Sequence, residues 1–347
     1  MKTISFETLR DFLARVLGAA GANAADAAIV AEHLATSDLA GHPSHGTVRI
    51  PQYVDLIQKG EIVPGGPFRV LSETPVTALC SGGWNFGQVN ARRAVEVAIA
   101  KARASGLGAV ALRDSAHIGR LGAYSEQAAA EGMISFVAVN NHGANPVMAP
   151  HGGAEGRLSP EALAFGVPRT GFPLVQDMSL TVLPEGKVRV ARNEGKPVPP
   201  DCLLDAKGRP TTDPNDFYGP PRGALLPLGG PVGYKGFGIA VMVDILSGAL
   251  SGAGCTLPGR MRSGNAAFIL AMRADAFASA QETAREVESL ATWIKSCPPR
   301  PGAAEILLPG EAEARQKERG RQAGMEVGSG TWGRLVETAR TLGVTPP

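Results

Sequence analysis

The stretch from residue 91 to residue 139 constrains the fold of this chain more than any other part of its sequence. It opens with an alanine-rich helical pattern, and the apolar run Gly108–Leu112 that follows has the length of a buried strand. A second helix is expected over 122–130 and a second strand over 134–139. This order of strand, helix and strand predicts a βαβ unit of an α/β protein. It places His117 beyond the carboxyl end of the first strand, the edge at which open α/β sheets bind ligands.

Amphipathic helices are expected at both ends of the chain. Apolar residues at helical spacing predict a helix over 5–18 with Ser5 as its N-cap, and Asn23 can cap a second helix. Near the C-terminus, a polar helix over 311–322 carries acidic and basic residues at i,i+4 spacing, which is typical of a solvated face. The pairs are Glu311 with Arg315 and Glu313 with Lys317.

The middle of the chain is rich in glycine and proline, which indicates short elements and many turns. The segment 235–250 is nearly all apolar and predicts a central helix, and 277–295 predicts an amphipathic one. The three tryptophans, Trp84, Trp293 and Trp332, are interpreted as packing residues. Further strands are expected over 162–167, 174–178, 187–191 and 265–272.

Composition excludes several classes of protein. The 347 residues include 34 Lys or Arg and 32 Asp or Glu, so the chain lacks the basic surface of a nucleic-acid binder. The first ten residues contain no signal-peptide core, and the most hydrophobic run, 239–250, is interrupted by Asp244 and Gly248. We therefore expect a cytoplasmic protein without a membrane segment. The four cysteines stand apart, without metal-ligand spacing, and are expected to be reduced.

Common catalytic and nucleotide-binding motifs do not account for this sequence. It contains no GxxxxGK, HExxH or GxSxG, and no strand that the pattern predicts is followed by GxGxxG. The segment Gly236–Gly238 lacks the third glycine of that fingerprint. If a dinucleotide binds, it does so without the ordinary Rossmann motif. The histidines show no HxH or HxxxH spacing, and no metal is expected.

The distribution of histidines is the strongest chemical indication in the residues themselves. Five of the six lie in loops rich in Gly, Pro, Ser or Asn, where an imidazole is free to transfer protons near neutral pH. His45 follows Ser44 and precedes Arg49 by four residues, so a single helical turn is expected to present an imidazole and a guanidinium to one small anion. The five loop histidines are His42, His45, His117, His142 and His151.

The segment 39–62, LAGHPSHGTVRIPQYVDLIQKGEI, resembles the signature of the type-2 malate/L-lactate dehydrogenase family, also called the sulfolactate dehydrogenase-like family. The similarity continues through FGQ, DSAHIGR, VMAPHGG, LLDAKGRPTTDP, GYKGFG, DILSGALSGAG, WIKSCP, ILLPGE and GSGTW, and so spans nearly the whole chain. The NNHG stretch and the charged C-terminal helix resemble most closely its bacterial hydroxycarboxylate dehydrogenase B branch.

The resemblance implies a non-Rossmann α/β fold, NAD or NADP as cofactor, and a homodimer whose active site lies near the subunit boundary. The implied substrates are small 2-hydroxy acids and their 2-oxo counterparts, and some members of the family reduce cyclic imino acids instead. The domains expected on this basis are a helical dimerisation module, 1–69 with 286–347, and a catalytic, NAD(P)-binding α/β domain, 70–285.

Matching the family's motifs residue by residue assigns the site. His117 matches the catalytic acid/base, Ser44 and His45 match a pair beside nicotinamide and substrate, and Arg49 matches the carboxylate-binding arginine. Asp177 is implied to orient a histidine. His45 is implied to contact the cofactor, and backbone contacts to the cofactor are implied for His117, Ile118, Gly119, Phe172, Pro173, Leu174, Val175, Gln176, Pro309, Gly310 and Glu311.

Two further residues are assigned to ligands from their positions. Asn141 follows the second strand at the ligand edge of the sheet and is expected near the substrate. Lys235 begins the apolar helix, where it is either a surface cation or a contact to substrate carboxylate or cofactor phosphate.

The chain departs from the family's usual pattern at three places. Relatives read T-N-P where this chain has Pro160-Glu161-Ala162, which removes a hydroxyl and is expected to add negative charge near an anionic site. Leu180 and Tyr234 also replace residues usual in the family. Three functions are therefore compared: a 2-hydroxy acid dehydrogenase, a cyclic imino acid reductase, and a non-catalytic descendant that binds cofactor or a small acid.

Overall fold

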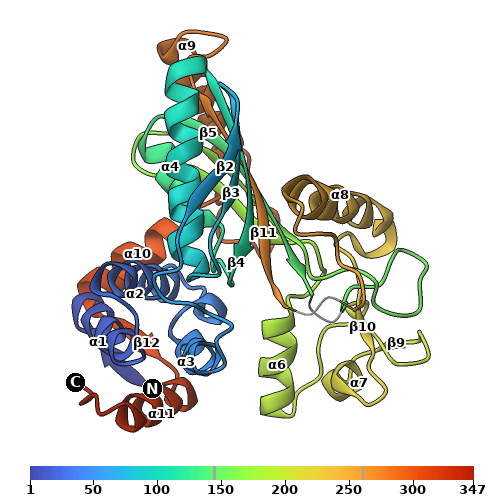
Figure 1. The fold of residues 1–347 in the computed structure, drawn as a ribbon. Helices are drawn as coiled ribbons and strands as arrows, with labels where there is room; N and C mark the ends of the chain where they lie inside the picture. The colour runs from blue at the N-terminus through green and yellow to red at the C-terminus, as the bar shows by residue number, and fades with distance from the viewer. Residues whose placement is uncertain (144–145, 260–261) are drawn as a thin grey trace.

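A computed structural model describes residues 1–143, 146–259 and 262–347, and within them the main sheet has seven strands in the order β2-β3-β4-β11-β5-β6-β7 (Figure 1). Strands β3 and β4 are parallel, and the other neighbouring pairs of this sheet are antiparallel. The predicted α/β class with a mixed sheet is confirmed. The strands are β2 (Arg69–Glu73), β3 (Thr77–Ser81), β4 (Leu107–Ser115), β5 (Met133–His142), β6 (Ala162–Val167), β7 (Leu174–Ser179) and β11 (Gly264–Arg273).

The predicted strand, helix and strand are present, but the two strands are not neighbours. Helix α5 (Gly122–Ala130) joins β4 to β5, and both strands are antiparallel to β11, which lies between them. They therefore run parallel to each other without pairing, so the predicted βαβ unit is present in split form, with β11 inserted between its strands. The loop after β4 still carries His117 at the carboxyl end of that strand.

Helix α4 (Gly87–Ser105) covers one face of the sheet (Figure 1) and packs through small side chains. Ala94, Ala98 and Ala102 are fully buried in the cluster that includes residues of β4 and β11. In β4, a Cβ at Gly108 would lie 2.1 Å from the Ala98 carbonyl oxygen. The close approach of helix and strand therefore depends on glycine at this position. Helix α5 packs on the same cluster, against β5 and β6.

Helix α8 (Tyr234–Asp244), which continues into a π-helical turn (Ile245–Ala249), is not central as predicted. Ala240 is buried with residues of β5 and β6, but Met242 and Leu250 are 56% and 57% exposed. An apolar pattern indicates that a helix face needs a partner, and it does not say whether that partner belongs to the same chain.

A second hydrophobic cluster joins the two ends of the chain, where strands β1 and β12 pair antiparallel. The Ser5 side chain accepts a hydrogen bond from the N–H of Thr8, and that of Asn23 accepts one from Asp26, so both predicted N-caps are confirmed. The elements gathered here are β1 (Lys2–Ile4), α1 (Phe6–Ala19), α2 (Ala24–Leu39), α3 (Ile50–Gln58), α10 (Glu311–Ala323), β12 (Met325–Val327) and α11 (Ser329–Thr341).

A third group of short elements follows β7. The strand predicted over 187–191 is wrong, because this segment lies inside helix α6 (Glu185–Glu194). Its alternating valines suggest a strand, but Arg189 pairs with Glu185 at i,i+4 and Gly195 ends the helix in the left-handed conformation. The other elements are β8 (Leu203–Leu204), β9 (Pro210–Thr211), α7 (Pro214–Tyr218) and β10 (Ala224–Leu225).

Helix α9 (Ala280–Lys295) lies at the end of the sheet far from α1 and α11 (Figure 1). Ser279 and Glu282 form a capping box that begins it. The packing role predicted for Trp293 is wrong, since this side chain is 76% exposed, whereas Trp332 packs against Phe12 with ring centroids 5.9 Å apart. No helix within the described ranges is long and apolar enough to cross a membrane.

Candidate active site

His45 and His117, which lie on separate loops, have their rings stacked with centroids 5.7 Å apart and planes at 15°. Both side chains are half-buried. Ser44 Oγ lies 3.0 Å from His45 Nδ1, and Tyr53 Oη lies 2.8 Å from His117 Nδ1. Each imidazole is therefore held by a hydroxyl at one nitrogen, which leaves its Nε2 as the nitrogen available to a ligand.

The loop that carries His45 begins at the C-terminal end of α2. Asp38 accepts hydrogen bonds from the Thr47 N–H (2.8 Å) and hydroxyl (2.5 Å), and burial raises the pKa of Asp38 to about 6 against the effect of these bonds. A Cβ at Gly46 would lie 2.0 Å from Asp38 Oδ1, so this turn requires glycine. The predicted single helical turn is wrong, because two 3₁₀ turns, Pro43–His45 and Thr47–Arg49, meet at Gly46.

Arg49 folds back over this loop. Its Nε donates to the Ser44 carbonyl oxygen at 2.7 Å and its Nη1 donates to Gln52 at 3.0 Å. Among the described residues its Nη2 has no hydrogen-bond partner, so one edge of the guanidinium can receive an anion. The arginine and the histidine pair are close enough for the positive charge to act on both rings.

The His117 loop is anchored from three different elements. The N–H of Ile118 donates to Asn265 (2.9 Å), that of Arg120 to His33 Nε2 (3.0 Å), and that of Gly122 to Asp177 (2.7 Å). These acceptors belong to β11, α2 and β7, respectively. Because the loop between β4 and α5 is fixed along its length, His117 is preorganised before any ligand arrives.

Gly119 lies in the middle of this loop at φ +79°, in the left-handed region. A Cβ there would lie 2.3 Å from His33 Nε2, the atom that accepts the Arg120 N–H. Both the conformation and the contact therefore require glycine. Gly119 was predicted to contact the cofactor, and these two constraints give a structural reason for glycine at the same position.

Burial and positive charge keep the three imidazoles neutral. Burial is the larger cause for each, and the charge of Arg49 lowers the pKa values of His45 and His117 further. The pKa of His45 falls to about 3, that of His33 to about 3, and that of His117 well below 6.5. At neutral pH the site therefore presents neutral imidazoles beside a permanent cation.

Asp177 was assigned to orient a histidine, and its recorded hydrogen bond goes to the Gly122 N–H instead. Burial raises the pKa of Asp177, against that hydrogen bond and the charge of Arg120. Within the described ranges no histidine ring is among its hydrogen-bond partners. Its observed contact ties β7 to the His117 loop.

The two segments assigned to the cofactor, which are far apart in the sequence, meet in space. The Val175 N–H donates to the Pro309 carbonyl oxygen at 3.2 Å, and a Cβ at Gly310 would lie 3.0 Å from the carbonyl oxygen of Pro173. A cavity of about 240 Å³ lies beside this junction and includes Phe172 in its lining. Its other lining residues are Arg169, Glu288, Ala291, Thr292, Lys295, Leu308 and Glu311.

Glu311 is engaged within the protein. Although burial acts in the opposite direction, the Leu308 N–H, Lys295 and Arg315 lower the pKa of Glu311 to about 2. The predicted pair with Arg315 is confirmed. The predicted pair of Glu313 with Lys317 is wrong, because Glu313 contacts His42 (3.2 Å).

Lys317 instead lies 2.7 Å from Glu126 on α5, which also binds the buried Arg120. The polar face of α10 therefore contacts the active-site loops and is not simply solvated.

Asn141 and Lys235, which were assigned to ligands from their positions in the sequence, lie at the edges of the candidate site. The Asn141 N–H donates to Ser159 Oγ at 3.1 Å, and its side-chain oxygen accepts from Ser263 at 3.2 Å. Lys235 lies on the first turn of α8 with its ammonium 6.0 Å from the Tyr234 ring centroid. In the part of the chain that the structure describes, neither side chain has a recorded contact with His45 or His117.

The departures from the family pattern have different structural consequences. Burial and the neighbouring Asp244 raise the pKa of Glu161 well above its usual value, and Ser159 donates to it at 2.5 Å. Burial therefore disfavours the charged form of Glu161 and acts against the added negative charge expected at this position. Leu180 is fully buried in the core, and Tyr234 is 53% exposed.

Near the C-terminus lies a glycine pattern to which the sequence analysis assigned no cofactor-binding role. Gly328, Gly330 and Gly333 follow β12 and open α11 with GxGxxG spacing. However, β12 pairs only with β1, antiparallel, and none of the three glycines has another group within 4 Å of its ideal Cβ position. The parallel βαβ context and the tight packing of a Rossmann fingerprint are missing in these described residues.

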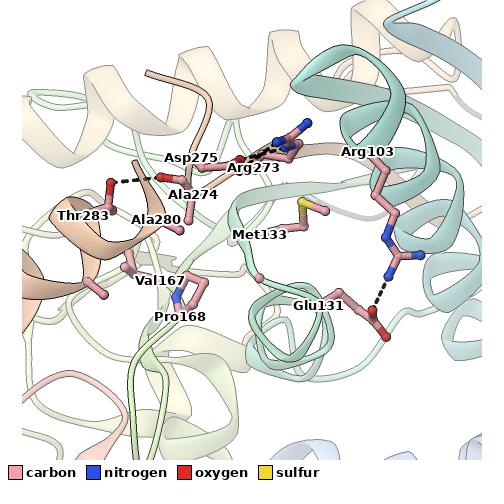
Figure 2. Close-up of a pocket in the computed structure, with 12 residues that line it drawn as sticks. Arg103, Glu131, Met133, Val167, Pro168, Arg273, Ala274, Asp275, Ala280 and Thr283 are labelled. Carbon is pink, nitrogen blue, oxygen red and sulfur yellow. Dashed lines mark hydrogen bonds and ion pairs between the residues drawn. The ribbon is translucent and has the colours of Figure 1, made fainter. Parts of the chain in front are cut away.

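A larger cavity of about 430 Å³, shown in Figure 2, lies between the end of α4 and the beginning of α9. Its charged lining residues are paired with each other, Arg103 with Glu131 and Arg273 with Asp275. None of the predicted site residues lines it. Cavity size therefore does not identify the candidate site, which is defined instead by the paired imidazoles of His45 and His117. Among the described residues, no group of three His, Cys, Asp or Glu side chains is placed to hold a metal ion.

Sequence reasoning missed the residues that support the histidines. Tyr53, Gln88, His33 and Asn265 were not assigned, although Tyr53 is four residues from Arg49 on α3 and Gln88 belongs to the FGQ motif. The i,i+4 spacing of Arg49 and Tyr53 indicated a shared helix face. Nothing in the local sequence indicated His33 or Asn265, whose contacts depend on the tertiary fold.

The fold and site define an α/β protein with preorganised neutral imidazoles beside an arginine, an arrangement suited to acid–base chemistry on a small anion. A family model described as malate/L-lactate dehydrogenase matches residues 4–336. Hydroxycarboxylate dehydrogenase B of Escherichia coli K12 is 34% identical over 343 residues, covering 97% of this chain and 94% of the relative.

Two solved structures are similar along their whole length. The malate dehydrogenase of Entamoeba histolytica has a TM-score of 0.93 at 29% identity, covering 100% of this chain and 99% of that one. A delta1-piperideine-2-carboxylate reductase from Pseudomonas syringae has a TM-score of 0.84 at 26% identity, covering 98% and 100%. This chain belongs to the malate/L-lactate dehydrogenase family.

Proposed function

We propose that this protein is an NAD- or NADP-dependent oxidoreductase that interconverts small 2-oxo and 2-hydroxy carboxylic acids. The observation that carries the proposal is the stacked pair of His45 and His117 beside the free edge of Arg49. A 2-oxo acid offers a carboxylate for a guanidinium and, one atom away, an oxygen that needs a proton when the carbonyl is reduced. Family membership supports the same reaction class.

The junction of residues 172–176 with the 309–311 turn fits a nicotinamide cofactor. The adjacent cavity combines an aromatic ring, Phe172, with Lys295 and with Arg169, whose guanidinium lies 4.9 Å from the Phe172 ring centroid. The aromatic ring suits the adenine of a dinucleotide, whereas Lys295 and Arg169 are each paired with a carboxylate of the same lining, Glu311 and Glu288 respectively. When bound, the cofactor supplies or accepts the hydride at C2 of the substrate.

The chain's own residues have three tasks. Arg49 binds the substrate carboxylate and orients C2. A histidine of the stacked pair, when protonated at both ring nitrogens, gives the Nε2 proton to the C2 oxygen during reduction and, as the neutral ring with a free Nε2, takes it back during oxidation. His117 is the residue assigned to this step. The anchors at Ile118, Arg120 and Gly122 hold the loop so that this transfer needs little rearrangement.

The test is oxidation of NADH and of NADPH by the purified protein with a panel of 2-oxo acids and cyclic imino acids. We expect turnover with at least one 2-oxo acid and the reverse reaction with its 2-hydroxy acid. Turnover of cyclic imines alone would favour the second candidate, which the similarity to the Pseudomonas syringae reductase supports. Cofactor binding without turnover of any substrate would favour the non-catalytic alternative.

The homodimer is also part of the proposal. Phe165 of β6 is 47% exposed, and Ile239 and Met242 of the adjoining α8, with Ile245 of the π-helical turn that follows it, are 42% to 56% exposed. The Phe165 ring is tilted at 38° against that of Phe136, and Phe136 packs on the cluster that includes Ala240 and Val243 of α8, so we infer that the exposed side chains form one apolar surface. Such a surface favours burial against a second copy of the chain, and it lies within 70–285 and not in the helical module expected to dimerise.

Sedimentation equilibrium is expected to give a dimer, and Met242→Glu is expected to give monomers because a carboxylate would be buried in the interface. The matched control is Val190→Glu, at an apolar residue of α6 that is 54% exposed and outside this surface. A monomeric wild type, or a Met242→Glu variant that remains dimeric, would reject this interface.

A further inference from the structure

A line of hydrogen bonds runs behind His117 and ends in a buried amide. Gln88 Nε2 donates to Tyr53 Oη at 2.7 Å, and Tyr53 Oη lies 2.8 Å from His117 Nδ1. Tyr53 and Gln88 are each 1% exposed, so neither can exchange these partners for solvent. The three residues come from α3, α4 and the loop after β4.

Because Gln88 is the donor at one end of these hydrogen bonds, the direction of the bond between Tyr53 and His117 is fixed. Since the Tyr53 oxygen accepts from Gln88, its own O–H remains to be donated, and His117 Nδ1 is the acceptor at hydrogen-bond distance. If Nδ1 carried the proton instead, the buried Tyr53 hydroxyl would lose its acceptor, which is costly. Burial raises the pKa of Tyr53 to about 12, so the hydroxyl keeps its proton at working pH.

We propose that Tyr53 and Gln88 are positioning residues that set which imidazole nitrogen of His117 carries the proton. In the arrangement described, Nδ1 accepts from Tyr53 and the proton is on Nε2, the nitrogen available to substrate. His117 thus offers an N–H to the oxygen of a bound 2-oxo acid, which polarises the carbonyl. This inference rests on the proposed function for its catalytic meaning, while the tautomer itself is a property of the protein alone.

The same line can also support His117 with both nitrogens protonated. Nδ1 then donates to the Tyr53 oxygen, and the Tyr53 hydroxyl needs another acceptor. Gln88 supplies it when its amide turns by half a rotation, because the oxygen and nitrogen of an amide have nearly the same shape. Among the described residues Gln88 Oε1 has no hydrogen-bond partner, so the rotation breaks no other recorded bond of that oxygen.

Charged and titratable neighbours favour the neutral ring over this doubly protonated form. Arg49, His45 and His33 face His117, and after burial they are the causes that lower its pKa. In the resting state His117 is therefore neutral, and the Gln88 amide N–H donates to the Tyr53 oxygen. Proton uptake by His117 is coupled to rotation of the Gln88 amide.

The direct test is the ¹⁵N spectrum of imidazole-labelled protein at neutral pH, in which the two neutral tautomers have different nitrogen shifts. His117→Ala identifies the His117 signals by their disappearance. We expect the Nε2–H tautomer in the wild type and a loss of this preference in Tyr53→Phe, which keeps the ring that packs on Phe86. An Nδ1–H wild type, or an unchanged spectrum in Tyr53→Phe, would overturn the proposal.

Gln88→Glu provides a second test with the opposite outcome. When ionised, the introduced carboxyl group only accepts, so the Tyr53 hydroxyl turns toward it and the Tyr53 oxygen then accepts from His117 Nδ1–H. We expect the Nδ1–H tautomer and a His117 titration shifted to higher pH by the added negative charge. The matched control is Gln127→Glu, because the Gln127 amide also makes one hydrogen bond, to the Arg92 carbonyl oxygen at 3.3 Å, outside this line.

Kinetics separate a positioning role from a merely structural one. Tyr53→Phe is expected to lower kcat by about 10- to 100-fold and to shift the pH profile, with cofactor affinity unchanged. Equal kcat values and pH profiles in Tyr53→Phe and wild type would count against the catalytic meaning of the line. If the tautomers respond as expected and no 2-oxo acid is turned over, the positioning role of Tyr53 and Gln88 is retained and the proposed reaction is rejected.

Discussion

His117→Ala is expected to lower kcat by about 10²- to 10⁴-fold while leaving cofactor affinity almost unchanged. The imidazole is the proposed proton donor and acceptor at the substrate oxygen, whereas the cavity proposed for the cofactor lies beside Phe172 and the 309–311 turn. Steady-state kinetics with the substrate found in the panel and fluorescence titration with reduced cofactor measure the two effects separately.

The fold should survive this substitution. The backbone anchors of the loop, at Ile118, Arg120 and Gly122, do not use the His117 side chain. Circular dichroism and an unchanged melting temperature serve as the control. Normal turnover in a folded His117→Ala variant would transfer the acid–base role to His45, whose ring is stacked on His117 and whose Nδ1 lies 3.0 Å from Ser44 Oγ.

Arg49→Ala is expected to raise KM for the carboxylate substrate by about 10²- to 10³-fold, with a smaller effect on kcat. The substitution removes the arginine assigned to hold the substrate carboxylate, and it also removes the bond from Nε to the Ser44 carbonyl oxygen. Initial rates over a wide range of substrate concentrations distinguish the KM effect from the kcat effect.

The same variant has a signature in its pH dependence. Arg49 lowers the pKa values of His45 and His117, so its removal raises both toward the ordinary value. Oxidation needs a neutral imidazole, and the acid limb of its rate profile therefore moves to higher pH. Arg93→Ala, at an exposed arginine of α4, is the charge-matched control. Unaltered KM and pH profile in Arg49→Ala would remove this arginine from the proposed site.

Local features of the fold were predictable because they depend on neighbours in sequence. The N-caps at Ser5 and Asn23 and the strands around His117 need only short-range patterns, and the structure confirms them. The insertion of β11 between β4 and β5 was not predictable, since it pairs residues more than a hundred positions apart. The helix over 185–194 was misread because its alternating valines imitate a strand.

The residues of the candidate site also separate into those predictable from neighbouring sequence and those that depend on the tertiary fold. Ser44, His45 and Arg49 lie within six residues, and their proximity follows from the sequence. The meeting of His45 with His117 is tertiary, and it was expected through the family's pattern and not from spacing. Tyr53 and Gln88 were missed because a tyrosine and a glutamine acquire meaning only once their hydrogen-bond partners are known.

The anchoring of the His117 loop constrains how this chain can vary. His33 lies on α2, which packs in the cluster that joins the chain ends, whereas Asn265 and Asp177 belong to the sheet, and all three hold one short loop. Neither part could be exchanged for its counterpart from a distant relative without refitting the other. Recombination between homologues should therefore succeed when its breakpoints keep these three acceptors and their loop from a common parent.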